Sequence, residues 1–314
     1  MVSTPNALLT PVVFLVFNRP KCTVLSLAAI RVARPARLYV VADGPRSDHP
    51  RDEALCAEVR SLVEQGVDWT CEVIREYSPD NLGLALRVSS GLDAVFARET
   101  EAIILEDDCV ADPTFFPFCA ELLERYRGEP KVGQISGVTF QGNGSDHAAS
   151  YYFSRYPDCW GWATWRRAWR NYDHTMSAWR QAGTRDWLAA KISDPAEKRY
   201  WIHSFDATAD GRMNSWAYRW ILSLWQQDSV GITPYRNLVS NIGFGREATH
   251  TQGTSPLAAL PVFPVSFPLV HPGTFACDAA ADERTSRFCY RRPTWAARLR
   301  LRLRRVFFPR KGEA

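Results

Sequence analysis

The sequence predicts an α/β protein in which helices flank both faces of a mainly parallel sheet. Short apolar runs rich in valine, isoleucine and leucine alternate with segments of helical periodicity through the first 127 residues. Such alternation implies parallel strands joined by right-handed helical crossovers. The chain of 314 residues is 46% hydrophobic and 23% charged, which excludes a disordered or fibrous protein and allows a sizeable core.

Four strands and four helices are expected in this first part. The expected strands are Val12–Phe17, Arg37–Ala42, Cys71–Tyr77 and Ala102–Leu105. The expected helices are Cys22–Val32, residues 50–65, Asn81–Phe96 and Asp112–Arg127. Asp112 is expected as the N-cap of the last helix and Pro113 as its first residue, because aspartate and proline favour these positions.

The second half of the chain has a different composition. Ten of the twelve tryptophans lie between residues 160 and 225. Periodicity predicts a helix over about 214–227, with Trp216, Trp220 and Ile221 near one face.

We expect three parts along the chain: a main domain over 1–255, a proline-rich wrap over 256–290 and a tail over 291–314. Five prolines between residues 256 and 272 favour an extended segment wrapped over the body. The formal net charge of +4 hides a basic C-terminus, since the residues from Arg284 onward carry ten arginines, one lysine and one glutamate.

The tail has apolar residues at helical spacing between its arginines, from Trp295 to Phe307. This pattern predicts a basic amphipathic helix that binds an anionic membrane surface, and the alternatives are a nucleic-acid patch or a disordered tail. We expect no nucleic-acid partner, because the rest of the chain is acidic and carries no recognisable binding motif.

A cytoplasmic protein, peripheral at the inner face of the plasma membrane, is expected from three features. The apolar run Val12–Phe17 is too short for a signal peptide, and no run approaches the ~20 residues that span a bilayer. The eight cysteines form no CxxC pair and no zinc spacing, so we expect reduced thiols.

Three polar clusters follow the expected strands, at the edge where parallel sheets bind ligands. They are Asn18-Arg19, Asp43-Gly44 and Glu106-Asp107-Asp108. The three consecutive acidic residues fit a site for Mn²⁺ or Mg²⁺, which hard oxygen ligands and phosphate oxygens would share. A solvated acidic turn is an equally good interpretation.

The other two clusters each have a functional and a structural interpretation. Asp43 fits an acceptor of hydrogen bonds from a ribose or a base, or an Asx-turn before Gly44. Arg19 fits a fork that binds phosphate, or a surface arginine before Pro20.

Two further segments could contact a sugar or a diphosphate. Trp160 and Trp162, on either side of Gly161, could stack on a sugar ring, although core packing must explain most of the tryptophans. The glycine-containing loop that leads to Thr249 and His250 could close over a diphosphate, with His250 as a metal ligand or phosphate donor.

Together these residues resemble GT-A nucleotide-sugar glycosyltransferases. The chain is similar to a bacterial family-2-like group, the hemolytic protein HlpA-like proteins, and distantly similar to the eukaryotic alpha-mannoside beta-1,2-N-acetylglucosaminyltransferase. The matching pieces are Phe17-Asn18-Arg19-Pro20, Val41-Ala42-Asp43-Gly44, Leu105-Glu106-Asp107-Asp108, Asp112-Pro113-Thr114-Phe115-Phe116, Gly161-Trp162, Ser215-Trp216-Ala217-Tyr218, Gly243-Phe244-Gly245-Arg246 and Thr249-His250.

The resemblance implies a fold, a reaction and a set of roles. The fold would be GT-A with a Rossmann-like sheet, and the roles would fall on residues of the matching pieces. Arg19 would contact the donor diphosphate or nucleotide, Asp43 the nucleoside, Glu106 and Asp107 the nucleotide and sugar, and Asp108 the metal. Gly161 and Trp162 would line the sugar site, and Thr249 and His250 would sit on the closing loop over the donor.

One departure from the family concerns the general base. The eukaryotic relative has an aspartate just after the tryptophan that Trp216 matches, whereas Ala217 and Tyr218 follow it here. Asp206 or Asp210, slightly upstream, is the expected substitute.

The function expected from this resemblance is metal-dependent transfer of a sugar, with inversion, from a nucleotide-diphosphate donor to a hydroxyl of a surface glycan or lipid-linked sugar. One alternative is a nucleotidyltransferase that acts on sugar phosphates, although residues 12–25 lack the glycines of a phosphate loop. The other is a catalytically impaired sugar-binding protein at the membrane.

Overall fold

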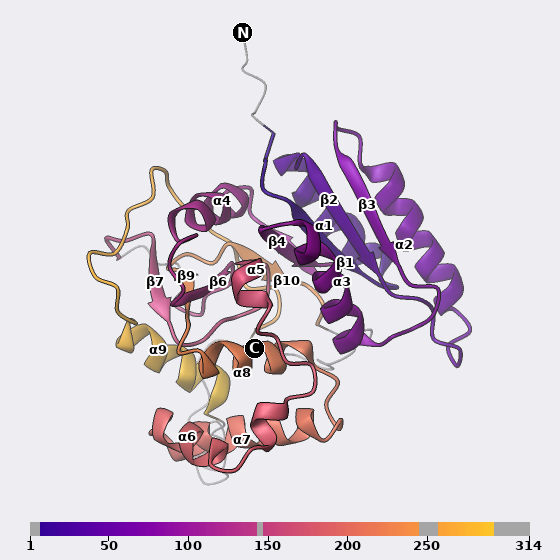
Figure 1. The fold of residues 1–314 in the computed structure, drawn as a ribbon. Helices are drawn as coiled ribbons and strands as arrows, with labels where there is room; N and C mark the ends of the chain where they lie inside the picture. The colour runs from indigo at the N-terminus through magenta and orange to yellow at the C-terminus, as the bar shows by residue number, and fades with distance from the viewer. Residues whose placement is uncertain (1–6, 143–146, 245–256, 292–314) are drawn as a thin grey trace, which may run out of the picture.

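The computed structural model describes residues 7–142, 147–244 and 257–291. Its centre is an eight-stranded sheet with the order β3-β2-β1-β4-β8-β6-β9-β7, next to a two-stranded sheet of β10 and β5 (Figure 1). The strands are β1 (Val12–Val16), β2 (Arg37–Ala42), β3 (Glu72–Tyr77), β4 (Glu101–Glu106), β5 (Cys109–Ala111), β6 (Val132–Ser136), β7 (Tyr151–Ser154), β8 (Trp162–Trp165), β9 (Val230–Pro234) and β10 (Val239–Asn241).

Helices cover the sheet and build a second layer beyond it. They are α1 (Pro20–Ala33), α2 (Asp52–Gly66), α3 (Leu84–Arg98), α4 (Phe115–Arg125), α5 (Arg166–Trp169), the short helix η1 (Ser177–Arg180), α6 (Thr184–Lys191), α7 (Pro195–Ala209), α8 (Trp216–Gln226), α9 (Ala279–Thr285) and the π-turn η2 (Ser286–Tyr290). None of the helices in the described ranges is long and apolar enough to cross a membrane.

The expected α/β class is confirmed. Strands β3, β2, β1 and β4 are parallel, and a helix leads from each to the next along the chain up to β4. All four predicted strands and four predicted helices form close to their expected bounds. The far half of the sheet is mixed, because β8 runs antiparallel to both β4 and β6.

Helices cover both faces of the sheet, and the alternating side chains of β1 contact the helices on each face. Successive side chains of a strand point to opposite faces. Val12, Phe14 and Val16 of β1 belong to the cluster that packs against α1, α2 and α4, whereas Val13 and Leu15 belong to the cluster with α3, α5 and α8. Every residue of β1 is therefore apolar and buried.

Two details of the helices differ from the prediction. Asp112 does not cap α4 directly: its carboxylate accepts hydrogen bonds from the backbone and hydroxyl of Thr114, and this turn delays the helix to Phe115. Ile221 lies in the cluster with α7, opposite Trp216 and Trp220, which face the sheet. Helix α8 thus packs on both sides, which a one-sided pattern does not reveal.

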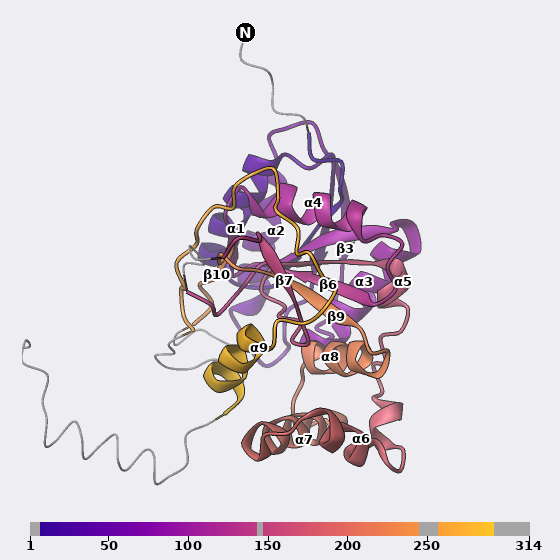
Figure 2. The same cartoon turned by 90° about the vertical axis from the view of Figure 1, so that its left-hand side faces the viewer.

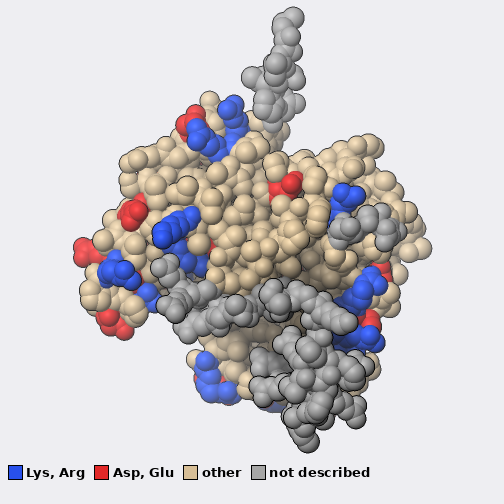
Figure 3. Space-filling view, turned by 180° about the vertical axis from the view of Figure 1, so that it is seen from behind, with Lys and Arg blue, Asp and Glu red and all other residues tan. Residues whose placement is uncertain are grey.

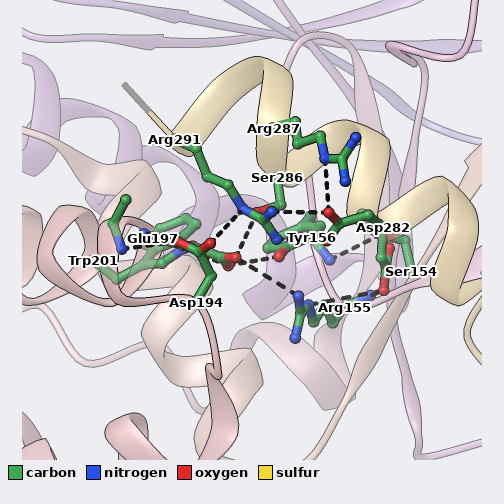
Figure 4. Close-up of polar contacts among 12 residues, drawn as sticks. Ser154, Arg155, Tyr156, Asp194, Glu197, Trp201, Asp282, Ser286, Arg287 and Arg291 are labelled. Atoms are coloured by element: carbon green, nitrogen blue, oxygen red, sulfur yellow. Dashed lines mark hydrogen bonds and ion pairs between the residues drawn. The ribbon is translucent and has the colours of Figure 1, made fainter. Parts of the chain in front are cut away.

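A buried polar network holds the C-terminal segment against α7 (Figure 4). Glu197 of α7 is fully buried and accepts hydrogen bonds from the hydroxyls of Tyr156, at 2.6 Å, and Ser286, at 2.5 Å. Asp282 of α9 accepts from the hydroxyl of Ser154 and the backbone of Arg155. These bonds fix α9 and η2 over the aromatic cluster that α7 and α8 share.

The segment between β10 and α9 has no helix or strand over residues 257–276 apart from turns. Three of its backbone N–H groups donate hydrogen bonds to the rest of the molecule. Phe263 donates to the carbonyl of Asn237, Val265 to the hydroxyl of Thr114, and Val270 to the hydroxyl of Ser150. In two views it runs around the side of the molecule near α4 and β7 (Figures 1 and 2). Seen from behind the view of Figure 1, the visible Lys and Arg side chains lie in small separate groups (Figure 3).

Candidate functional site at the carboxyl edge of the sheet

The carboxyl edge, where β1, β2 and β4 end, collects the polar clusters that the sequence places after these strands. Arg19 follows β1, Asp43 follows β2, and Glu106 ends β4 immediately before Asp107 and Asp108. Because the three strands are parallel neighbours, their ends lie at one edge of the sheet. The sequence prediction that these residues share one site is consistent with this placement.

Arg19 binds the acidic cluster with both ends of its guanidinium. One nitrogen donates to Asp107, and the other donates to Oδ2 of Asp108 at 2.8 Å. Burial alone would lower the pKa of Arg19, but the adjacent charges of Asp107 and Asp108 raise it above its ordinary value. The arginine therefore stays charged and orients both carboxylates.

The acidic cluster carries more negative charge than Arg19 neutralises. Burial, with the nearby charge of Asp108, raises the pKa of Glu106 to about 8, although Arg19 opposes the shift. Burial also raises the pKa of Asp107 to about 6, against the lowering effect of Arg19. Within the described part of the chain, Arg19 is the cation that pairs with these carboxylates.

Asp43 is engaged with its neighbours through both carboxylate oxygens. Oδ1 accepts from the backbone of Gly44 and Leu82, each at 2.9 Å, and Oδ2 accepts from the backbone of Gly83 at 3.0 Å and the amide of Asn81 at 3.1 Å. These four bonds use the acceptor capacity of a carboxylate. In this structure Asp43 fixes the entry to α3, which is closer to its structural interpretation than to an open ribose acceptor.

Two adjoining cavities open at the carboxyl edge. The edge cavity, of about 280 Å³, is lined by Leu15, Val16, Phe17, Arg19, Asp43, Arg46, Asn81, Gly83, Leu84, Arg87, Val88, Glu106, Asp107 and Asn214. The outer cavity, of about 500 Å³, shares Arg19 and Arg46 with it and extends to Lys21, His49 and Arg51. The predicted residues Arg19, Asp43, Glu106 and Asp107 therefore line one concave site.

Asp108 directly precedes β5 and is buried, and it is not among the residues that line either cavity. A Cβ atom on Gly243 would stand 1.9 Å from Oδ2 of Asp108, so glycine is required for the carboxylate to keep its place. Asn241 also approaches Oδ1, at 3.4 Å. The other residues expected on this loop, Thr249 and His250, lie outside the described residues.

Gly161 and Trp162 are packing residues in this structure. Gly161 has φ of +62°, and a Cβ there would stand 2.6 Å from Val239. Trp162 is 0% exposed and stacks on Trp216, with ring centroids 5.3 Å apart. Trp160 is half-buried, with its ring edge-on to Phe244. The geometry gives Trp162 the core role that the sequence left as its alternative.

Asp206 and Asp210 do not line either cavity at the carboxyl edge. Both lie at the end of α7, in the outer helical layer. Asp206 accepts from the indole of Trp179 at 3.0 Å and pairs with Arg185 at 2.5 Å. Asp210 is exposed and pairs with Arg212 at 3.0 Å. Their contacts are those of residues that tie α7 to its surroundings.

Three residues of the edge cavity escaped sequence reasoning: Arg46, Arg87 and Asn214. Arg46 follows Asp43 by three residues, so its place after β2 was a usable signal. Arg87 lies in the first turn of α3, where helical spacing from Gly83 and Leu84 points to the same face. Asn214 accepts from the backbone of Ala85, a contact across 129 residues that no local pattern reveals.

Comparison with known proteins gives similarity in structure alone. No family model matches the chain, and no curated protein matches it. The chain is similar to the mannosyltransferase PcManGT from Pyrobaculum calidifontis in complex with GDP-Man and Mn²⁺, at 13% identity over 69% of this chain and 74% of that chain, with a TM-score of 0.36.

Two further similar structures carry other names. One is UTP-bound UGPase from Acinetobacter baumannii, at 8% identity over 72% of this chain and 85% of that chain, with a TM-score of 0.34. The other is 4-diphosphocytidyl-2C-methyl-D-erythritol synthase from Anaerococcus prevotii, at 12% identity over 63% of this chain and 84% of that chain, with a TM-score of 0.31.

Proposed function

We propose that the protein is a metal-dependent glycosyltransferase of the GT-A type, which moves a sugar from a nucleotide-diphosphate donor to a hydroxyl acceptor. The observation that carries the proposal is the edge cavity, which Arg19, Asp43, Glu106 and Asp107 line, with Asp108 paired to Arg19. Ligands of open α/β sheets bind outside the carboxyl ends of the strands.

The donor set suits Mn²⁺ or Mg²⁺. No group of three or more His, Cys, Asp or Glu among the described residues could hold a metal ion. The proposed ion would have one or two carboxylates and take its remaining ligands from phosphate oxygens and water. Asp108 would hold it, and His250 is the second ligand proposed from the sequence of its loop. When bound, the cation neutralises charge on the departing diphosphate.

The chain's own residues prepare the site for an anion. Arg19 lines both cavities while its Nη1 and Nη2 pair with Asp108 and Asp107, and the guanidinium N–H groups that these contacts leave over would donate to a phosphate group. Asp43 holds the loop of residues 81–83, of which Asn81 and Gly83 also line the cavity. We place the diphosphate beside Arg19 and the nucleoside towards Asp43.

The general base of the resembling family has no carboxylate at the matching position of this chain. Ala217 stands where the resembling family has its base, and Tyr218 hydrogen-bonds Tyr200 at 2.6 Å. Asp206 and Asp210 pair with arginines away from the cavity. These contacts favour, as a second candidate function, a sugar-binding protein of impaired catalytic activity.

A donor-turnover assay with Mn²⁺ separates the candidate functions. Release of nucleoside diphosphate from a nucleotide sugar supports the glycosyltransferase, and loss of this release in Asp108→Asn ties it to the site. Pyrophosphate formed from a nucleoside triphosphate and a sugar phosphate would instead establish a nucleotidyltransferase. Binding without turnover would establish the impaired protein. NMR of the product's anomeric configuration tests inversion.

The acceptor that we propose is a surface glycan or a lipid-linked sugar, reached at the inner face of the membrane through the basic tail. That tail lies outside the described residues. Co-sedimentation with anionic liposomes compares the full chain with one that ends at Arg291, which keeps the contacts of Arg291 to Glu283 and of Ser286 to Glu197. Equal binding by both chains contradicts the membrane role.

A further inference from the structure

Helix α1 is apolar on both of its sides. Its inner side, with Leu27 and Ile30, is buried in the cluster that it shares with α2 and the sheet. Its exposed apolar residues are Val24, Leu25, Ala28 and Val32. The three larger ones are 46%, 52% and 59% exposed in this order. A helix at the surface of a soluble protein normally has polar residues on its outer side, so this outer side is expected to have a partner.

The exposed residues form one continuous strip. At 3.6 residues per turn they fall, with Lys21, within about 100° of the helix circumference. Leu9, which is 78% exposed, extends the strip, because its neighbour Leu8 forms a β-bridge with Pro35 just beyond the end of α1. We call Leu9, Val24, Leu25, Ala28 and Val32 the α1 face. It holds four of the ten large exposed apolar side chains among the described residues, and such a concentration marks an interaction surface.

The charge around the α1 face has one sign. The first 42 residues of the chain contain no Asp or Glu, and their cations are Arg19, Lys21, Arg31, Arg34 and Arg37. Arg31 pairs with Asp68 at the surface. Lys21 and Arg34 are exposed near the two ends of α1 and pair with no acid in the described part of the chain. The α1 face is therefore an apolar strip with a free cation near each end.

This charge pattern selects among the possible partners. A second copy of α1, paired in either direction, would set cation against cation at both ends of the strip. The C-terminal tail of the chain is no better suited, since residues 292–314 carry seven arginines and one lysine against one glutamate. An anionic lipid surface offers both an apolar interior for the strip and negative charge for Lys21 and Arg34.

We propose that the α1 face docks on the surface of an anionic bilayer, with the apolar side chains among the lipids and Lys21 and Arg34 at the headgroup phosphates. The inference rests on the proposed function, because it names the surface through which a lipid-linked acceptor is approached. Helix α1 begins directly after Arg19, and Lys21 also lines the outer cavity. A bilayer against the α1 face would thus lie beside the opening of the candidate site.

The test is co-sedimentation of the full chain with two kinds of vesicle, one of phosphatidylcholine and one of equal parts phosphatidylcholine and phosphatidylglycerol. The double variant Leu25→Gln with Val32→Gln should bind the mixed vesicles roughly tenfold more weakly than the wild type, because two apolar side chains no longer enter the lipid. Both positions are exposed, so the fold should tolerate the polar side chains.

A matched control has the same two changes elsewhere on the surface. Leu86→Gln with Val270→Gln replaces side chains that are 44% and 53% exposed on other segments, and it should bind within about twofold of the wild type. Arg34→Gln tests the charge and carries the test if the double variant does not fold. It should weaken binding to the mixed vesicles by about fivefold and leave binding to phosphatidylcholine unchanged.

Three results would overturn the inference. They are a wild type that does not bind the mixed vesicles, a double variant that binds as the wild type does, and equal losses in the double variant and its control. Sedimentation velocity without vesicles gives a fourth, since a wild-type dimer that the double variant converts to a monomer would make a second copy the partner.

Failure of the proposed function is measured separately. Without vesicles, the double variant should release nucleoside diphosphate from a nucleotide sugar at the wild-type rate. A wild type that docks on the mixed vesicles but neither binds nor turns over a nucleotide sugar would contradict the proposed function and leave the docking surface in place.

Discussion

The contact between Gly243 and Asp108 shows how a single missing side chain holds the candidate metal ligand in place. We expect Gly243→Ala to displace the Asp108 carboxylate, since the added Cβ would stand 1.9 Å from Oδ2. The affinity for UDP with Mn²⁺ should fall by about tenfold, the equivalent of ~1.4 kcal/mol. Calorimetric titration of the variant and the wild type with UDP in the presence of Mn²⁺ measures the two affinities.

The control for that substitution is Gly128→Ala, where an added Cβ meets nothing within 4 Å. Its nucleotide affinity should match the wild type. If Gly243→Ala binds Mn²⁺ and UDP as the wild type does, then Asp108 is not the ligand that the proposal requires.

A second residue, Asp52, links the site to acid stability. Hydrogen bonds from Arg46 lower the pKa of Asp52 to about 2, with a smaller contribution from Asn18, while burial opposes the shift. A folded-state pKa below the unfolded value of about 3.9 stabilises the protein above that value, and this contribution is lost as the pH falls toward 2.

The prediction for Asp52 concerns the free energy of unfolding as a function of pH. Asp52→Asn should reduce it by about 1–2 kcal/mol at pH 7 and by much less at pH 2.5, a difference that denaturant titration at the two pH values measures. Arg46 is about a third exposed, which limits the effect. A loss that is the same at both pH values would contradict the assigned ionisation.

At the scale of elements, the C-terminal segment depends on the fully buried Glu197. Glu197→Gln keeps the shape but removes the charge that accepts from Tyr156 and Ser286. We expect the free energy of unfolding to drop by about 2–3 kcal/mol, and limited proteolysis to release the segment from about residue 278 sooner.

A matched substitution distinguishes the buried acid from an exposed one on the same segment. Glu283 pairs with Arg291 at the surface, so Glu283→Gln should cost at most about 1 kcal/mol. Equal losses in the two variants would show that the hydrogen bonds of Glu197, drawn in Figure 4, are not what fastens the segment.

Elements with a one-sided or fully apolar pattern were predictable, and those fixed by distant contacts were not. The runs that became β1, β2 and β4 are buried on both faces, which their unbroken apolar sequence indicates. Strand β8 was not predicted, because Trp162 and Trp165 lie in a segment so rich in tryptophan that no strand pattern stands out. Its antiparallel pairing of Trp162 with Ile104 also joins residues 58 positions apart, which local sequence does not indicate.

In the candidate site, too, local sequence predicted some residues, and contacts between distant parts of the chain fixed the others. Arg19, Asp43 and Asp107 were predictable because each follows a strand whose end the topology brings to one edge. Asp43 was predicted to meet a nucleoside, yet its oxygens are taken by residues 81–83, which local sequence does not disclose. Asn214 reaches the cavity only because α8 packs against α3.

For the whole molecule, ligand binding should appear as added stability, since a ligand that binds the folded state alone shifts the unfolding equilibrium. A nucleoside diphosphate with Mn²⁺, at a hundredfold excess over its dissociation constant, adds about 2.7 kcal/mol, which raises the Tm of a chain of 314 residues by roughly 4 °C. Differential scanning calorimetry measures the shift, and EDTA should abolish it if the cation is required.

Two substitutions make that measurement specific to the carboxyl edge. Asp108→Asn should lose the Mn²⁺-dependent part of the shift, because a neutral amide is a poorer ligand for a hard cation. Asp228→Asn, an exposed residue paired with Lys191 outside both cavities, should keep it. A shift that survives in Asp108→Asn would mean that nucleotide and metal bind somewhere other than the acidic cluster, and the carboxyl edge would then need another role.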